Sequence, residues 1–179
     1  KEIEEIFAGM CDDYLESYKI LRDVVVENSQ NEILKSYIQY GEILYGCKED
    51  NKEQPSVYIW SPGISGQGFD EYLLEVRKKP DEQPEEKLKN ILSVVDVLTD
   101  CIKALHTAGL MHLDIKPSNF LVQYDSDYKI KSGNISLFDV DTLCSIDSKF
   151  LRVAGTKGFW SPEVEKKKRP DNRSDIYSL

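Results

Sequence analysis

The chain has 179 residues, of which 40% are hydrophobic and 31% charged, as is typical of a globular protein with a sizeable core. Its formal net charge of −9 argues against non-specific binding to nucleic acid, which depends on neutralising phosphates. No apolar run approaches a membrane span, and charges are mixed through residues 1–20, so no signal peptide is predicted. The 4 cysteines are widely spaced and there are only 2 histidines, so we expect reduced thiols in a cytoplasmic protein and no zinc site.

The N-terminal third predicts a helix followed by two strands. Apolar residues recur at three- and four-residue steps through residues 2–26, which predicts a helix. Residues 33–45 and 56–61 are rich in β-branched and aromatic side chains, which predicts two strands. The polar stretch Lys48–Pro55 is predicted to be the turn between them.

A glycine-containing connection and a short helix are predicted next. Gly63, Gly66 and Gly68 do not follow the order of a phosphate-binding fingerprint, so we interpret them as a flexible connection. It leads into a short helix at Phe69–Arg77, and the charged, proline-containing stretch Lys78–Glu86 predicts a surface loop.

A long helix is predicted at residues 85–107. Pro84 suits its first turn, and the acidic residues that follow Pro84 are favourable near the positive end of the helix. Gly109 suits the position at which such a helix ends. Its apolar residues mark a single stripe, which consists of Leu88, Ile91, Leu92, Val95, Leu98, Ile102 and Leu105.

The segment that follows places an acid, an amine and an amide close together, at Asp114, Lys116 and Asn119. The carboxylate can orient a hydroxyl and accept its proton, and the amine can neutralise charge on a transferring phosphate. The amide oxygen can hold a magnesium ion, and Pro117 stiffens the backbone between these groups. This set of residues predicts phosphoryl transfer. For an isolated His-x-Asp, a turn containing a satisfied Asp is the simpler interpretation.

A hairpin and a basic run follow. Phe120–Tyr124 and Asn134–Val140 predict two strands with a polar tip at Asp125–Gly133. Asn119 and Asp139 then stand at adjoining strand ends. Further on, the basic run Lys166–Arg169 predicts a solvated loop, and a docking site for an acidic substrate is the alternative.

Four segments, in the same order along the chain, resemble landmarks of eukaryotic-type protein kinases. They are the catalytic loop at His112–Asn119, the magnesium-binding D-F-G segment at Leu137–Asp141, the end of the activation segment at Gly155–Glu163, and the start of the central helix of the large lobe at Ser174–Leu179. The resemblance is specific over residues 112–179. Over residues 1–111, the chain resembles the family only in its hydrophobic pattern and in the order of its helices and strands.

The resemblance implies an α+β, protein kinase-like two-lobe fold that is incomplete in this chain. Residues 1–61 would be part of the small N-lobe, and residues 62–179 the hinge and the N-terminal part of the C-lobe. No glycine-rich loop or Lys-bearing strand precedes the first helix, so we expect part of a longer domain. Trp60 and Ser61 would lie in the hinge that binds adenine, and a plain core position is the alternative for Trp60.

The same resemblance implies ATP and Mg²⁺ as cofactors. Asp114 would orient the acceptor hydroxyl, and Lys116 would contact the transferred phosphoryl group. Asn119 and Asp139 would bind the magnesium that bridges the ATP phosphates. Lys116, two residues after the acid, and Thr156 both indicate a Ser/Thr acceptor in this family.

Supporting roles are implied for several other residues. Glu16 is the candidate for the helix glutamate that pairs with the strand Lys, although Ser17 stands at the usual spacing; a solvated acidic face is the alternative. Asp175 would brace the backbone of the catalytic loop, and Glu163 would pair with an Arg beyond this chain. His112 would pack and form hydrogen bonds without transferring protons.

Three residues depart from the family pattern. Leu113 replaces the Arg that reads a phosphate on the activation loop, so activation by loop phosphorylation is not expected. Val140 replaces the Phe whose packing switches the active and inactive states, which would blunt that switch. Asp141 replaces Gly, and it either adds a metal ligand or faces solvent.

The leading hypothesis is a protein Ser/Thr kinase that transfers the γ-phosphate of ATP to a protein hydroxyl. Its expected partners are ATP and a protein substrate, without nucleic acid and without a membrane span in this segment. One alternative is a pseudokinase that acts as a binding or scaffold module. The other is a kinase-like small-molecule phosphotransferase, against which the peptide-binding character of Gly155–Glu163 argues.

Overall fold

The computed structural model describes residues 19–21, 23–24, 37–38, 42–48, 51–60, 63, 65–78, 83–126, 129–148 and 155–179. For residues 42–48, 51–60 and 131–133 it describes the backbone only. The described residues of the predicted N-terminal helix, 19–21 and 23–24, are helical, and Leu21 is buried in the core. The candidate residues Glu16 and Ser61, and the side chain of Trp60, lie outside the described part of the chain.

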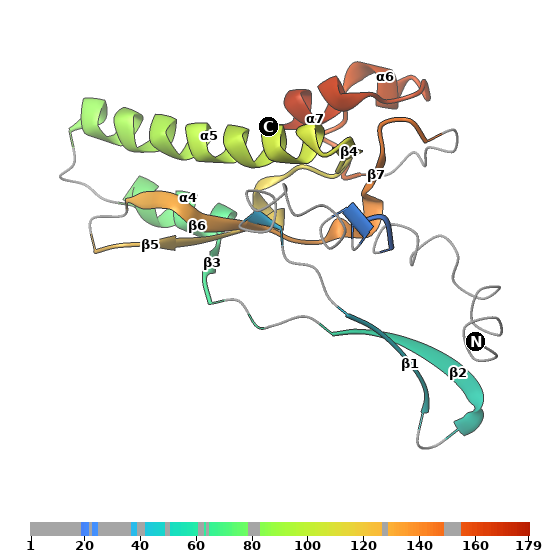
Figure 1. Cartoon of the computed structure of the whole chain (residues 1–179). Helices are drawn as coiled ribbons and strands as arrows, with labels where there is room; N and C mark the ends of the chain where they lie inside the picture. The colour runs from blue at the N-terminus through green and yellow to red at the C-terminus, as the bar shows by residue number, and fades with distance from the viewer. Residues whose placement is uncertain are drawn as a thin grey trace.

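The first two strands form an antiparallel hairpin, which projects away from the helices in Figure 1. β1 (Glu42–Lys48) pairs with β2 (Asn51–Trp60), and the register shifts between Cys47 and Lys48. The predicted turn at Lys48–Pro55 is therefore wrong in its extent, because Lys48 still pairs with Asn51. Pairing with a neighbouring strand decides where a strand ends, and polar composition alone does not.

The rest of the described chain is built around a long helix and a three-stranded antiparallel sheet (Figure 1). The sheet has the order β3 (Gln67–Gly68), β5 (Phe120–Tyr124) and β6 (Ile130–Leu137). Helix α5 (Pro84–Thr107) packs against β6, and α4 (Phe69–Lys78) packs against β5. The core between these elements includes the fully buried residues Ile102, Leu105, Phe120, Ile135 and Leu137.

The ends of α5 lie where the sequence predicts them. Pro84 begins the helix, and Gly109, with φ 76°, follows the cap residue Ala108. Only the second half of the predicted apolar stripe is buried, at Leu98, Ile102 and Leu105. The first half is exposed by 40–57%, at Leu88, Ile91, Leu92 and Val95. The single stripe is therefore a wrong prediction, because the early turns of α5 bury Asn90 and Val94 instead.

The predicted hairpin after the catalytic loop is present with different bounds. β6 begins at Ile130, so its tip is shorter than predicted, and Asp125 closes the tip by accepting the Lys129 amide through Oδ1 at 3.0 Å. The strand also ends at Leu137 and not at Val140. Asp139 adopts the left-handed conformation (φ 58°, ψ 58°), which cannot continue a strand, and the 3-10 turn η3 (Val140–Thr142) follows.

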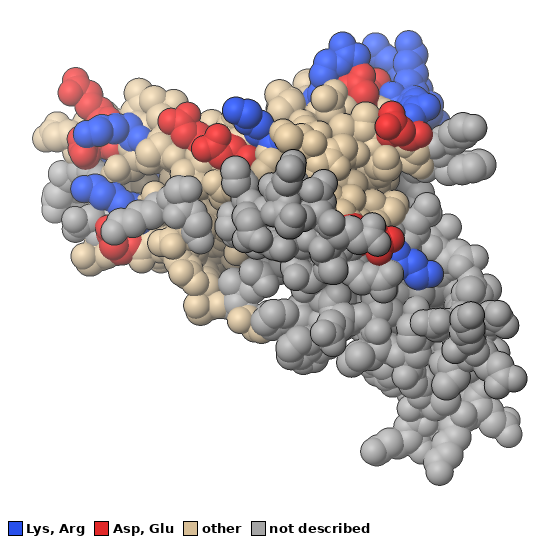
Figure 2. All heavy atoms as spheres, in the orientation of Figure 1, with Lys and Arg blue, Asp and Glu red and all other residues tan. Residues whose placement is uncertain are grey.

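The C-terminal part adds a short strand pair and two helices. β4 (Leu110–Met111) pairs with β7 (Cys144–Ser145), and α6 (Pro162–Glu165) and α7 (Asn172–Ser178) follow. The basic run Lys166–Arg169 lies in an exposed turn after α6, as predicted, and Figure 2 shows Lys and Arg side chains gathered there.

Two further observations concern the described residues as a whole. None of their helices combines the length and the apolar character needed to cross a bilayer. Cys101 is fully buried in α5, and burial raises the pKa of its thiol to about 12, so this cysteine is an inert core residue.

Candidate active site

The candidate catalytic loop runs between β4 and β5, and its residues His112, Asp114, Ile115 and Asn119 are buried. Its C-terminal end is the 3-10 turn η2 (Pro117–Asn119), in which the Asn119 amide donates to the Lys116 carbonyl at 3.0 Å. Pro117 occupies the first position of this turn, where its fixed φ is favourable. Asp114 and Asn119 are only 8% and 3% exposed, so the loop presents fixed side chains and not mobile ones.

Asp114, Lys116 and Thr156 form one connected cluster. The Lys116 ammonium donates to Asp114 Oδ2 at 2.7 Å and to Thr156 Oγ1 at 2.8 Å. Burial favours the protonated form of Asp114, but hydrogen bonds from Lys116 and Thr156 outweigh it, so the pKa of Asp114 is lowered. The carboxylate is therefore ionised at neutral pH and can accept a hydrogen bond from an incoming hydroxyl.

Asn119 connects Asp114 to the predicted magnesium segment. Its side-chain nitrogen donates to the Asp114 carbonyl at 2.9 Å and to Asp114 Oδ2 at 3.3 Å. The Asn119 carbonyl accepts the Phe138 amide at 3.0 Å, which fixes the residue before Asp139 beside the loop. Because the amide nitrogen points at Asp114, the Asn119 side-chain oxygen faces the other way.

These donors fit a magnesium ion by their chemistry. Asp139 is exposed at the end of β6, and Asn119 precedes β5, which pairs with β6. One carboxylate and one amide oxygen suit Mg²⁺, which keeps several of its waters when bound to protein. Among the described residues no cluster of three His, Cys, Asp or Glu side chains provides an alternative metal site. That Asn119 and Asp139 share one cation remains a prediction.

His112 forms hydrogen bonds within the loop, as expected. It is fully buried; its Nδ1 accepts the Asp114 amide at 3.3 Å, so Nε2 carries the proton and donates to the Phe138 carbonyl at 3.3 Å. Thr142 Oγ1 donates to the His112 carbonyl at 2.5 Å. Burial lowers the pKa of His112, which keeps the ring neutral and suited to these two roles.

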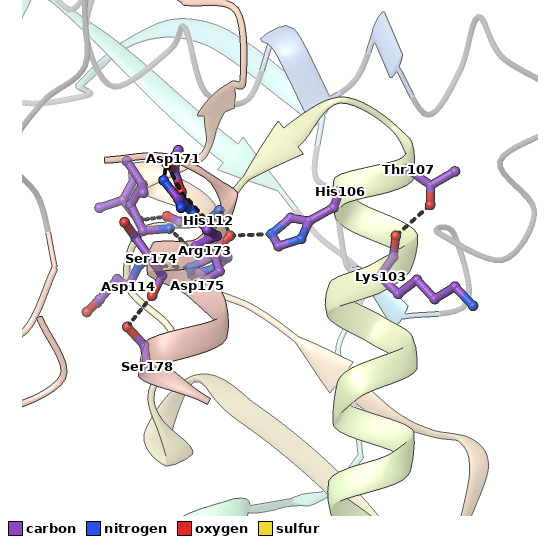
Figure 3. Close-up of polar contacts among 12 residues, drawn as sticks. Lys103, His106, Thr107, His112, Asp114, Asp171, Arg173, Ser174, Asp175 and Ser178 are labelled. Atoms are coloured by element: carbon purple, nitrogen blue, oxygen red, sulfur yellow. Dashed lines mark hydrogen bonds and ion pairs between the residues drawn. The ribbon is translucent and has the colours of Figure 1, made fainter. Parts of the chain in front are cut away.

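Asp175 braces the catalytic loop from α7, as Figure 3 shows. Its Oδ1 accepts the Leu113 amide at 2.8 Å, and its Oδ2 accepts the His112 amide at 2.9 Å. His106, in the last turn of α5, lies 2.9 Å from the same Oδ2. The bracing role of Asp175 was predicted, whereas no role was predicted for His106, because its partner lies 69 residues away and leaves no local pattern.

The end of the predicted activation segment packs closely on this loop. Gly155 has φ 105°, and a Cβ at this position would lie 2.5 Å from the Leu113 carbonyl oxygen, so only glycine fits there. Glu163 Oε1 accepts the Ser174 hydroxyl at 2.6 Å, and this hydrogen bond lowers the pKa of Glu163. The predicted partner of Glu163, an Arg beyond this chain, remains a prediction.

The three departures from the kinase pattern have clear positions. Leu113 has φ 64° and is held by Asp175 through its backbone. Val140 is 2% exposed and belongs to the core. Asp141 lies within η3, half-buried, and its role as a metal ligand or a solvent-facing residue remains open.

Residues 44–179 match the protein kinase domain family, and the chain belongs to this family. It is 33% identical over 98 residues to the dual specificity protein kinase zak2 of Dictyostelium discoideum. The aligned region covers 52% of this chain and 15% of zak2. It is 34% identical over 89 residues to the serine/threonine-protein kinase PknL of Mycobacterium tuberculosis, covering 50% of this chain and 22% of PknL.

A probable serine/threonine-protein kinase of Streptomyces coelicolor is 29% identical over 136 residues, covering 75% of this chain and 19% of that protein. The chain thus spans less than a quarter of the length of these curated relatives. The family match confirms the predicted α+β kinase fold. The scaffold and small-molecule alternatives find no support among these relatives.

Proposed function

We propose that this chain carries the catalytic loop of a Ser/Thr protein kinase that transfers the γ-phosphate of ATP to a protein hydroxyl. The observation that carries the proposal is the Lys116 ammonium, which bridges Asp114 and Thr156 at 2.7 and 2.8 Å. The carboxylate of Asp114, the ammonium of Lys116 and the hydroxyl of Thr156 come from two distant segments, and these hydrogen bonds hold them together at one site. The names of the bacterial relatives support the same activity.

Asp114 orients and deprotonates the acceptor. Its lowered pKa keeps the carboxylate ionised, so it accepts a hydrogen bond from the Ser or Thr hydroxyl of the substrate. As the hydroxyl oxygen bonds to the γ-phosphorus, the bond from that phosphorus to the β,γ-bridging oxygen breaks, ADP leaves, and the hydroxyl proton passes to this carboxylate. Lys116 lies within hydrogen-bond distance of the same carboxylate. Its positive charge there partly neutralises the negative charge of the transferred phosphoryl group.

Asn119 and Asp139 are the residues that would hold Mg²⁺ beside Asp114. When bound, the ion neutralises phosphate charge and holds the phosphate chain in line with the acceptor. Asn119 contributes rigidity, because its amide nitrogen is fixed on Asp114 and its backbone on Phe138. Trp60 and Ser61 remain the proposed adenine contacts.

The presence of Leu113 favours a kinase whose activity does not depend on phosphorylation of its activation loop. The Arg that would read such a phosphate is replaced, and Asp175 fixes the Leu113 amide at 2.8 Å without it. On the other side, Arg169 donates to the Ser148 carbonyl at 2.7 Å and anchors the chain after β7.

The function is tested by replacing Asp114 with Asn in the full-length protein. We expect kcat to fall by roughly 10²- to 10⁴-fold, because the general base is lost, with little change in the KM for ATP. Asp147→Asn, which changes an exposed carboxylate after β7, is the matched control. An Asp114→Asn protein that folds normally and keeps the wild-type rate would refute the proposed role.

A further inference from the structure

A small cavity lies directly behind the catalytic carboxylate. Its volume is about 10 Å³, and its wall combines the catalytic loop, the end of the activation segment and α7. Asp114, Trp160, Ser161 and Ser178 contribute polar groups to this wall. A volume of this size corresponds to about one water molecule.

The described residues contain three buried side-chain polar atoms without a hydrogen-bond partner, and all three belong to residues that line this cavity. They are Asp114 Oδ1, Trp160 Nε1 and Ser161 Oγ. The Ser161 side chain also helps to lower the pKa of Glu163, but it has no partner within hydrogen-bond geometry. Buried polar atoms in folded proteins almost always have a partner, supplied by protein or by ordered water. Three such atoms around one small cavity therefore indicate a polar ligand inside it.

The chemistry of the three atoms identifies that ligand. The indole nitrogen can only donate, the ionised carboxylate oxygen can only accept, and the hydroxyl can do both. A water molecule satisfies all three: it accepts from Trp160, donates to Asp114 Oδ1, and exchanges a hydrogen bond with Ser161. Buried waters typically make about three hydrogen bonds of this kind.

We propose that this cavity is a binding site for one structural water, through which Trp160 and Ser161 position Asp114. The inference rests on the proposed function and adds two positioning residues to it. Lys116 fixes Asp114 Oδ2 at 2.7 Å, and the water fixes Oδ1, so the carboxylate plane cannot rotate. A fixed plane keeps the accepting oxygen aligned with the substrate hydroxyl.

Ser178 provides the matched control within the same wall. Its hydroxyl already has partners, because it lies 2.6 Å from the Phe159 carbonyl and 2.9 Å from the Ser174 carbonyl. It therefore has no need of the water. Ser178→Ala removes a hydroxyl from the cavity wall without removing one of the three proposed water partners.

The water is tested directly, without reference to activity, by NMR of the indole groups. In the full-length protein, the indole signal that disappears in the Trp160→Phe variant is assigned to Trp160. We expect the Trp160 indole proton to show a cross-peak to a long-lived water. A Trp160 signal without such a cross-peak would overturn the proposal.

Kinetics tests the positioning role. Ser161→Ala, and replacement of Trp160 by its benzothiophene analogue, remove the polar atoms and keep the side-chain shapes. We expect kcat to fall roughly 10- to 100-fold with an unchanged KM for ATP, because only alignment is lost. Ser178→Ala is expected to keep kcat near the wild-type value.

Failure of the two proposals gives different results. If the wild-type protein transfers phosphate and both cavity variants keep its kcat, the positioning role is wrong and the kinase function stands. If the wild-type protein transfers no phosphate, the function is wrong, and the NMR cross-peak alone decides whether the water is bound.

Discussion

Asp175 is a fully buried carboxylate that holds two distant segments of the chain together. It accepts the backbone amides of His112 and Leu113, and it lies 2.9 Å from the His106 ring nitrogen (Figure 3). Asp175 therefore fixes the positive φ of Leu113, and with it the position of Asp114 one residue later.

Replacement of Asp175 by Asn should destabilise the protein. An amide has one acceptor oxygen, so its NH₂ group would face a backbone N–H that loses its partner. We expect a loss of about 1–3 kcal/mol in the free energy of unfolding, measured with urea, and a reduced kcat. Asp147→Asn is again the control, and equal stability of the two variants would contradict this role for Asp175.

The residues that the sequence predicted to share a site, and that the structure joins by hydrogen bonds, are those with local signals. Asp114, Lys116 and Asn119 lie within six positions of one another, and their spacing alone predicts a shared site. His106, Trp160 and Ser161 were not assigned a role in the site, because each acts through a partner far away in sequence. The role of His106 follows from the contact of its ring with Asp175, and those of Trp160 and Ser161 follow from their place in the cavity wall. No local sequence pattern encodes either arrangement.

Helix α5 shows how tertiary packing decides which apolar residues are buried. Leu98 is 4% exposed in the core, whereas Leu92 is 54% exposed on the surface. Leu92 lines a shallow surface groove with Leu88 and several charged residues. The two leucines are otherwise alike, so they form a matched pair within one helix.

Truncation of these two leucines should have very different costs. Leu98→Ala leaves a cavity in the core and should lower the free energy of unfolding by about 2–5 kcal/mol. Leu92→Ala should change it by less than about 0.5 kcal/mol, as is usual for surface positions. The measurement is chemical denaturation of both variants. A comparable loss for Leu92→Ala would show that another part of the protein covers this face.

The same contrast explains which element boundaries could be predicted. The ends of α5 depend on Pro84 and Gly109, whose effects on the backbone are local. The ends of β1, β2 and β6 depend on strand pairing, so composition misplaced them. The left-handed conformation of Asp139 could not be anticipated, because non-glycine residues adopt it only when their surroundings impose it.

The stability of the whole molecule should fall in acid in two stages. Burial lowers the pKa of His112, so the unfolded chain binds a proton more readily, and stability falls as the pH drops below about 6.5. The pKa values of Asp114, Glu163 and Asp171 are also lowered. These carboxylates stabilise the fold above pH ~4, and that contribution is lost as the pH falls through their folded-state pKa values.

The test of this pH dependence is the urea midpoint measured from pH 8 to pH 3. We expect a decrease that begins near pH 6.5 and steepens below pH ~4. Most of the second stage should come from Asp114, because Glu163 and Asp171 are more exposed and solvent screens them. A midpoint that rises on acidification would contradict the assigned pKa directions.

The fold class was predictable because four landmarks of the kinase family occur in order over residues 112–179. The structure adds how they meet: α7 supports the catalytic loop, and the end of the activation segment closes over it. The division into lobes at residues 61 and 62 remains a prediction, as do the hinge contacts.

The central claim is that Asp114 serves a working Ser/Thr phosphotransferase. It is tested most directly by incubating the full-length protein with γ-labelled ATP, Mg²⁺ and protein acceptors, followed by phosphoamino-acid analysis. We predict label on serine or threonine that requires Mg²⁺ and disappears in Asp114→Asn. A correctly folded wild-type protein that labels no acceptor, or that labels tyrosine alone, would contradict the account.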